Sequence, residues 1–317
     1  MPRTSRATRA SSALACALLL SACSTQTRFV GSEPLAAAGA DAGVAGADAG
    51  AKTPTYRTDF DSGSGWSSTN HLPGSSTSFG VQLDGAADPS TAEIRFPGHP
   101  EYAATDDDTS ATLTEVYSAQ RFSFGTFRSR VRFGACAATE EVVNAAVGYF
   151  NDGGDENGNG ITDDVEISWQ VPCGTPSNLS LTVFTDDQAS PPAFRKLSHV
   201  IDFSTGDFYD TPSASQEGFV KSGNNPAFMR PELFDPSQFY ELGYEWHTDS
   251  LRFFLMLDGV DVTVWTLTDE THIPQLPVSF VYNAWHPPAH WYPASGSANF
   301  PAHDVVTHID WFEYFAE

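Results

Sequence analysis

One short segment carries a carboxylate, a hydroxyl and an amide at alternate positions. Glu166, Ser168 and Gln170 alternate with apolar residues in Val165–Val171, which reads VEISWQV. Successive side chains of a strand point to opposite faces, so the three polar groups should share one face. A polar face on an otherwise buried strand indicates a groove, and the alternative is a sheet surface that faces solvent. Of the three, only Glu166 carries a carboxyl group.

A second group of oxygen-bearing side chains lies just before this strand. Asp155, Asn157 and Asn159 alternate, and Asp163 follows after a Gly. Carboxylate and amide oxygens at this spacing form the kind of cage that Ca²⁺ prefers, so structural calcium is the expected cofactor. In an EF-hand pattern Glu166 would be the twelfth, bidentate ligand. We expect a shorter site that ends at Asp163, and the alternative is a polar turn without metal.

Several motifs around the strand resemble those of glycoside hydrolase family 16, whose catalytic strand reads Glu-Ile-Asp-Ile-Glu. The matching stretch here is EISWQ at residues 166–170. FGTFRSR at 124–130 is similar to the family's Tyr-Gly-x-Tyr-Glu-x-Arg strand, and NAW at 283–285 and IDW at 309–311 follow in the family's order. The resemblance spans roughly residues 57–317. It implies an all-β fold, a two-sheet antiparallel jelly-roll sandwich of the concanavalin A type, that acts on a β-linked polysaccharide.

The resemblance also implies roles for single residues. Glu166 would be the nucleophile, Ser168 stands where the family has an assisting Asp, and Gln170 stands where it has the acid/base. Asp310 would belong to a structural calcium site. The resemblance also implies that five residues contact the substrate: Arg130, Phe184, Asn283, Trp285 and Trp291. For the aromatic residues among them, the alternative is that they pack in the core.

The catalytic strand departs from the family in its chemistry. A retaining glycosidase needs two carboxyl groups about 5–5.5 Å apart, and the amide of Gln170 cannot protonate a leaving oxygen. No other register of the strand restores both carboxylates. Three functions therefore stay open: a glycoside hydrolase built on Glu166, a non-catalytic polysaccharide-binding module, or a calcium-stabilised structural or adhesion protein. Carboxylates that could compensate from other loops are Asp186, Asp187 and Asp304.

Short extended segments separated by turn residues fill the body of the chain. Apolar and polar residues alternate in Phe122–Phe133 and His308–Phe315, which is the period of strands. Leu251–Leu257 leads into Asp258-Gly259, a pair typical of tight hairpin turns. No window carries a sustained helical stripe. We therefore predict one β-sandwich domain over residues 56–317.

The N-terminal residues are typical of an export signal rather than of a fold. Three Arg among the first nine residues precede a short apolar run that ends in Leu-Ser-Ala-Cys at 20–23. This resembles a bacterial lipobox, so we expect loss of residues 1–22 and lipidation of Cys23. The exported protein would then be anchored to a bacterial membrane; the alternative is an ordinary secretory signal. Residues 23–55, rich in Ala and Gly, should form a flexible tether.

Cysteine usage and charge narrow the class of protein. Cys136 and Cys173 are the two Cys of the predicted domain, and a disulfide is expected in an oxidising compartment, with two buried thiols as the alternative. The formal net charge of -24 argues against a nucleic-acid partner, because phosphate binding needs clustered Lys and Arg. The expected partner is a polysaccharide. The membrane would be contacted only through the lipid, and the chain should be a monomer.

Overall fold

The computed structural model describes residues 52–87, 90–99, 113–186, 196–211, 219–287 and 299–317. The predicted export signal, Cys23 and most of the tether lie outside these residues, as does Trp291. Within the described part, no helix has the length and apolar character needed to cross a bilayer.

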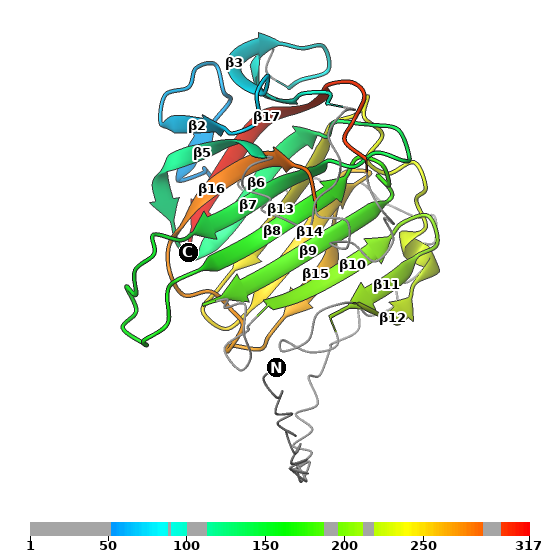
Figure 1. Cartoon of the computed structure of the whole chain (residues 1–317). Coiled ribbons are helices and arrows are strands. Elements are labelled where there is room, and N and C mark those ends of the chain that lie inside the picture. Colours follow the sequence, from blue (N-terminus) through cyan, green and yellow to red (C-terminus); the bar gives the residue numbers. More distant parts are fainter. Residues whose placement is uncertain (1–51, 88–89, 100–112, 187–195, 212–218, 288–298) are drawn as a thin grey trace, which may run out of the picture.

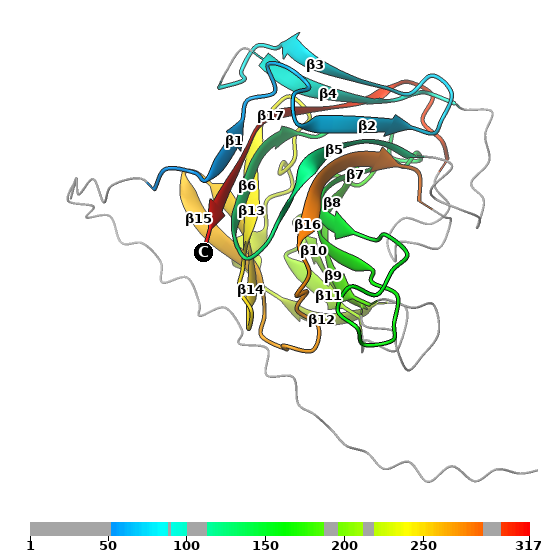
Figure 2. The ribbon, with the colours of Figure 1, turned by 90° about the vertical axis from the view of Figure 1, so that its left-hand side faces the viewer.

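The described chain forms two antiparallel β-sheets that pack face to face as two layers (Figures 1 and 2). The β17 sheet contains, in spatial order, β15 (Val260–Leu267), β14 (Leu251–Leu257), β13 (Tyr240–Trp246), β6 (Gly125–Arg132), β17 (Val305–Ala316), β4 (Ser90–Phe96) and β3 (Ser76–Gln82), with β1 (Tyr56–Thr58) also paired to β17. The β8 sheet contains β12 (Val220–Asn224), β11 (Asp207–Asp210), β10 (Lys196–Asp202), β9 (Asn178–Thr185), β8 (Val165–Pro172), β7 (Val143–Phe150), β16 (Val278–Trp285), β5 (Leu113–Phe122) and β2 (Trp66–Asn70). A single 3₁₀ turn, η2 (Pro226–Phe228), is the helical element of the described residues. The predicted all-β, two-sheet antiparallel sandwich is confirmed.

The core lies between the sheets and consists of the side chains on the inner face of each strand. On β8, Val165, Ile167, Trp169 and Val171 are at most 1% exposed, so the predicted alternation places its apolar side inward. Figure 2 shows β5, β7 and β16 bending toward the outer side of the β8 sheet, which makes that outer face concave. The polar parity of β8 lies on this concave face.

Aromatic rings from both sheets fill the centre of the core. Phe127 stacks on Tyr244 with ring centroids 4.6 Å apart, and Phe280 of the β8 sheet stacks on Phe312 of the β17 sheet at 4.4 Å. Such pairs add about 0.5–1.5 kcal/mol each beyond the burial of their area. The pair of Phe280 and Phe312 joins the two layers, and both pairs account for part of the aromatic content of the chain.

Two turn predictions have different outcomes. Asp258 and Gly259 have φ values of 53° and 77°, so the tight hairpin between β14 and β15 is confirmed. The expected strand Phe122–Phe133 is instead divided between β5 and β6. Gly125 opens β6 with φ 147°, and a Cβ there would lie 2.2 Å from the backbone oxygen of Phe315. This close approach requires glycine, and alternation alone does not reveal it.

The outer face of the β17 sheet carries arginines paired with acids, and one buried histidine. His308 on β17 is 6% exposed and lies opposite Arg132 of β6 and Glu93 of β4. Burial, followed by the charges of Arg132 and Arg95, lowers the pKa of His308 to about 4, while Glu93 acts in the opposite direction. The neutral imidazole is therefore the form that the folded state favours.

This histidine should make the fold sensitive to acid. An unfolded His takes up its proton near pH 6.5, whereas the folded one resists until its pKa of about 4. Its contribution to stability is therefore complete above pH 6.5 and is lost as the pH falls from 6.5 through 4. A shift of this size corresponds to about 3 kcal/mol. The free energy of unfolding, measured with urea at several pH values in this range, should fall with falling pH, and His308→Gln should reduce this slope. Equal slopes against pH for both proteins would contradict the assignment.

Candidate functional site

Strand β8 brings the three predicted catalytic-strand residues together on the concave face. Ser168 Oγ donates to Glu166 Oε1 at 2.5 Å, and Gln170 Nε2 donates to the same oxygen at 3.3 Å. Glu166 is partly exposed, whereas Ser168 and Gln170 are buried. Hydrogen bonds from neutral donors favour the ionised form of a carboxylate. The arrangement gives Glu166 Oε1 two neutral donors, and one of them is an amide that stands where a second acid would be.

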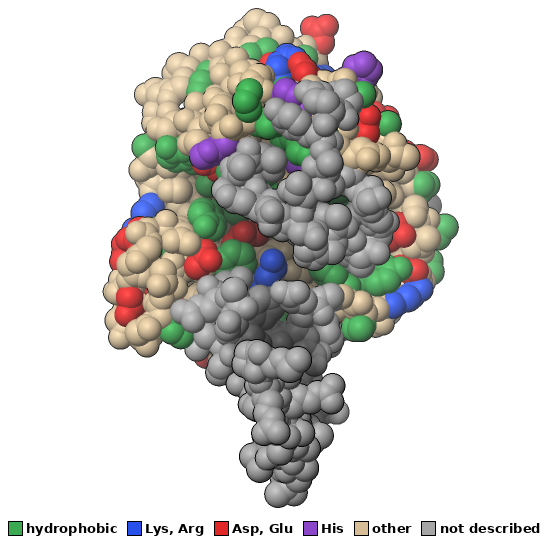
Figure 3. Space-filling view, in the orientation of Figure 1, with side chains coloured by type: hydrophobic (Ala, Val, Ile, Leu, Met, Phe, Trp, Pro, Cys, Tyr) green, Lys and Arg blue, Asp and Glu red, His purple; other side chains and the backbone are tan. Residues whose placement is uncertain are grey.

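Neighbouring strands continue the row of Glu166 across the concave face. Tyr149 of β7 and Phe184 of β9 lie directly opposite Glu166, and Lys196 of β10 lies opposite Phe184. The Nζ atom of Lys196 is 5.9 Å from the centre of the Phe184 ring. Figure 3, drawn from the side that faces this sheet, shows acidic, basic and hydrophobic side chains close together on its visible part. The row combines an anion, an aromatic ring and a cation.

A second row contains two buried acceptor oxygens that lack a partner. Asn283 of β16, Ala145 of β7 and Gln170 of β8 are aligned by strand pairing. Within the described residues, Asn283 Oδ1 and Gln170 Oε1 accept no hydrogen bond although both atoms are buried. An unsatisfied buried acceptor costs about 1–3 kcal/mol. The small side chain of Ala145 separates the two, which lie two strand spacings or about 10 Å apart.

The second carboxylate beside Glu166 is Asp164, at the other end from Gln170. Both acids act on the Tyr149 hydroxyl: burial first, and then the charges of Asp164 and Glu166, raise the pKa of Tyr149 to about 12. A phenol with such a pKa is a hydrogen-bond donor at neutral pH and a poor proton source. Tyr149 therefore does not replace the acid that position 170 lacks.

Two of the three carboxylates that could have compensated from other loops lie elsewhere. Asp304 pairs with Arg95 of the β17 sheet at 2.9 Å, which also lowers the pKa of Asp304 after the effect of the Gly98 amide. Asp186 faces the loop that precedes β8, and Asp187 lies outside the described residues. Neither Asp304 nor Asp186 is brought to Gln170.

The predicted substrate-contact residues divide between the two sheets. Phe184, Asn283 and Trp285 lie on strands of the β8 sheet, on the parity of its concave face. Arg130 lies on β6 of the other sheet, with its side chain on the outer face of that sheet and 4.6 Å from the Phe239 ring. The structure thus places three of the five on the same face as Glu166, with Phe184 directly opposite it, leaves Arg130 apart, and does not describe Trp291.

Asp310, predicted as a calcium ligand, is paired with an arginine side chain. Arg130 Nη1 forms an ion pair with Asp310, and the Ala87 amide donates to Asp310 at 2.8 Å. The other guanidinium nitrogen donates to the Gly85 carbonyl at 3.1 Å. The guanidinium thus provides positive charge at the place where the resemblance implies a metal, and it links β6 to the turn between β3 and β4.

Solved structures share this two-sheet arrangement. The Bacillus licheniformis beta-glucanase has a TM-score of 0.51 at 12% sequence identity, over 84% of this chain and 100% of that chain. A Crh5 transglycosylase in complex with NAG has a TM-score of 0.49 at 15% identity, over 82% and 83%. A prokaryotic beta-1,3-1,4-glucanase derived from a mouse hindgut metagenome has 0.48 at 13%, over 83% and 99%. No family model and no curated protein matches the sequence.

The chain has the fold of a β-glucanase. At this level of identity the likeness concerns the arrangement of the strands. The chemistry of the concave face must therefore be argued from the side chains present, and these include one carboxylate among the three predicted catalytic-strand residues.

The predicted calcium loop gathers oxygen ligands around two buried carboxylates. Asp163 is 0% exposed and Asp186, which follows β9, is 3% exposed. Asn157 Nδ2 donates to Asp163 Oδ1 at 3.0 Å, and Asn159 Nδ2 donates to Asp186 Oδ2 at 2.7 Å. Asp155 instead accepts the Asn159 and Gly160 amides at 3.0 and 2.8 Å. Among the described residues, no Lys, Arg or His pairs with Asp163 or Asp186. Two buried carboxylates without a cationic side chain beside them suit a hard cation such as Ca²⁺.

We propose that Ca²⁺ binds this loop through the carboxylates of Asp163 and Asp186. For a site of the extracellular class, with Kd of order 10⁻⁴ M, about 10 mM Ca²⁺ should stabilise the fold by about 2.7 kcal/mol relative to chelator. Thermal unfolding in Ca²⁺ and in EDTA measures the difference. Asp186→Asn should abolish the response, Mg²⁺ should not replace Ca²⁺, and identical melting temperatures in Ca²⁺ and EDTA would contradict the site.

Proposed function

We propose that this protein binds a β-linked polysaccharide on the concave face of the β8 sheet and does not hydrolyse it. The observation that carries the proposal is the contact from Gln170 Nε2 to Glu166 Oε1, because an amide occupies the place of the proton donor. General acid catalysis contributes about 100- to 10,000-fold, so its loss leaves binding as the role that the face can perform.

The groups on this face suit the hydroxyls and C–H faces of sugars. Gln170 Oε1 and Asn283 Oδ1 have no hydrogen-bond partner in the part of the chain that the structure describes, and a sugar hydroxyl that reaches them would remove the cost of leaving them unsatisfied. Trp285 is partly exposed and offers an aromatic face on which the apolar side of a sugar ring can stack, whereas Phe184 is buried beneath this face. Glu166 adds an anionic acceptor that forms stronger hydrogen bonds than a neutral one.

Hydrolysis is the second candidate, and one observation favours it. Ser168 and Gln170 both donate to Glu166 Oε1, and such donors orient a carboxylate as a nucleophile requires. Under this alternative the proton would come from outside the catalytic strand. We assign it second rank because neither Asp186 nor Asp304 is brought to Gln170.

Binding and hydrolysis can be separated in one set of measurements. Affinity electrophoresis on laminarin, lichenan, agarose and carrageenan should show retardation by a β-glucan without new reducing ends. Glu166→Gln should weaken the binding by about 10- to 100-fold, because it removes a charged hydrogen-bond acceptor. Glu270→Gln makes the same change at an exposed position and should leave the binding unchanged.

Two results would overturn the proposal. Release of oligosaccharides by the wild-type protein that disappears in Glu166→Gln would establish the hydrolase. The absence of retardation on all four polysaccharides, together with a melting temperature that responds to chelator, would instead favour a calcium-stabilised structural or adhesion protein.

We further propose that the protein is exported and held at a bacterial membrane by lipid on Cys23. Residues 23–55 would place the sandwich at a distance from the membrane so that it can reach a polymer. Metabolic labelling with a fatty-acid analogue tests this: the label should enter the wild-type protein and be absent from Cys23→Ser.

A further inference from the structure

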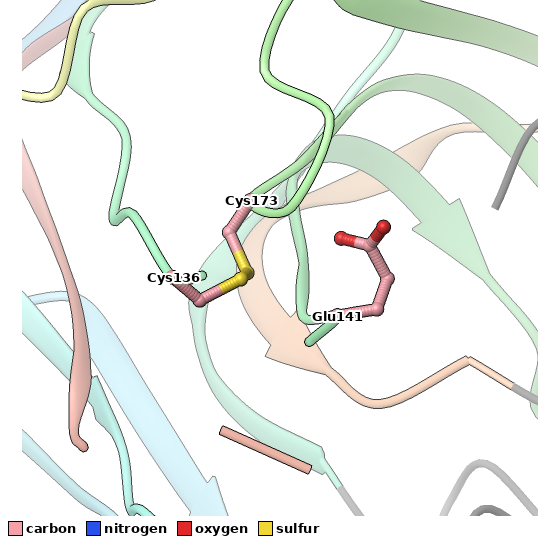
Figure 4. A group of neighbouring side chains, drawn as sticks. All are labelled: Cys136, Glu141 and Cys173. Atoms are coloured by element: carbon pink, nitrogen blue, oxygen red, sulfur yellow. A yellow bond between two sulfur atoms is a disulfide. The ribbon is translucent and has the colours of Figure 1, made fainter. Parts of the chain in front are cut away.

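The disulfide between Cys136 and Cys173 lies beside a buried carboxyl group (Figure 4). Glu141 is 2% exposed, and one of its carboxylate oxygens and the two sulfur atoms all lie within 4.8 Å of one another. The Gly174 amide donates to Glu141 at 3.1 Å. No described Lys, Arg or His pairs with this carboxyl, and burial raises its pKa to about 7 against the effect of backbone amides. The glycan site does not use this group.

A buried carboxyl without a counter-cation is costly, and two sulfurs lie within 4.8 Å of one oxygen of this carboxyl. Two thiolates and one carboxylate are a ligand set that zinc-class cations accept, in tetrahedral sites that leave a fourth position for water. We propose that Cys136, Cys173 and Glu141 form a binding site for such a cation when the disulfide is reduced. Bridging of the two sulfurs and binding of the metal would then exclude each other.

The chemical steps balance with a dithiol as the reductant. The dithiol gives two electrons and two protons to the disulfide, and it becomes a disulfide itself while Cys136 and Cys173 become thiols. The cation then displaces one proton from each thiol and is bound by two thiolates. It also replaces any proton on Glu141, so that binding releases protons to solvent.

The fold holds the three ligands by bonds that do not depend on the disulfide. The Val142 amide donates to Cys173 Sγ at 3.0 Å, and the Cys173 amide donates to the Val142 carbonyl at 2.9 Å. On the other side, the Ala137 amide donates to Glu140 Oε2 at 3.0 Å and closes the turn that carries Cys136. After reduction the sulfurs should therefore remain close enough to share an ion.

Access to the site comes from the side of Cys136. Cys173 is 1% exposed, whereas Cys136 is partly exposed. An incoming thiolate therefore meets Cys136 Sγ first, and Cys173 leaves as the thiolate, which the Val142 amide can stabilise. The same opening admits the cation.

Cobalt(II) gives a spectroscopic test with the full chain, in which Cys16→Ser and Cys23→Ser remove the other thiols. After reduction and anaerobic removal of the dithiol, the protein should bind an equivalent of Co²⁺ with visible tetrahedral bands and an ultraviolet sulfur-to-metal band. Zn²⁺ should displace the Co²⁺. The oxidised protein should show neither band.

Glu141→Gln tests whether the carboxylate binds the metal together with the two thiolates. It should weaken Co²⁺ binding by at least about tenfold. Glu270→Gln should have no effect. The proposal is overturned if reduced, folded protein gives no bands, or if Glu141→Gln binds Co²⁺ as tightly as the parent protein. If circular dichroism shows that reduction unfolds the chain, Zn²⁺ should restore the folded spectrum, and failure to do so also overturns it.

Discussion

Replacement of Gln170 by Glu together with Ser168 by Asp should turn the chain into an active β-glucan hydrolase. The double variant places a second carboxyl on the concave face four residues from Glu166, on the same strand and the same parity. The carboxyl introduced at position 170 would replace the amide that now donates to Glu166, so the site would hold the acid that glycosidic cleavage requires. The expected gain in reducing ends released from laminarin or lichenan is about 100- to 10,000-fold over the wild-type protein.

The control for this gain keeps the new acid and removes the nucleophile. Gln170→Glu with Ser168→Asp and Glu166→Gln should be inactive, because retaining hydrolysis uses both carboxyls. The bound glucan should still retard the inactive variant in affinity electrophoresis, although less than the wild-type protein. An active double variant would show that the rest of the face positions a sugar chain. A folded double variant that binds glucan but releases nothing would show that more than the acid is missing.

Local alternation suffices to predict the face that carries this chemistry. Glu166, Ser168 and Gln170 share a side because side-chain direction in a strand follows from neighbouring residues alone. The all-β class follows in the same way, because several strands show this period and Asp258-Gly259 marks a turn. These features need no knowledge of which strands pair.

Contacts between strands are the part that alternation does not reveal. Lys196 approaches Phe184 because β10 pairs with β9, and Asp186 faces Asn159 because the end of β9 lies beside the loop before β8. One feature of the sequence could have indicated the position of Asp186. It follows Phe184 by two residues, so the alternation of β9 assigns both side chains to the same side of the sheet. The ion pair of Arg130 with Asp310 joins residues 180 positions apart, and only the pairing of β6 with β17 brings them together.

Removal of the disulfide by Cys136→Ala with Cys173→Ala should be the most destabilising change away from the concave face. The bridge closes a loop with a sequence separation of 37 residues, for which the chain-entropy relation gives about 4 kcal/mol. For a domain of this size the melting temperature should fall by about 10 °C. Urea and thermal unfolding of the oxidised wild-type protein and the double variant measure both quantities.

Reduction of the wild-type protein provides the matched comparison for this loss. If chain entropy explains the stabilisation, reduced wild-type protein and the double Ala variant should lose similar free energy when no metal is present. Addition of Zn²⁺ should then restore stability to the reduced wild-type protein alone, because the Ala variant has no thiolates beside Glu141. A double variant as stable as the oxidised protein would mean that the hydrogen bonds of Val142 and Cys173 hold this end of the sandwich without the bridge.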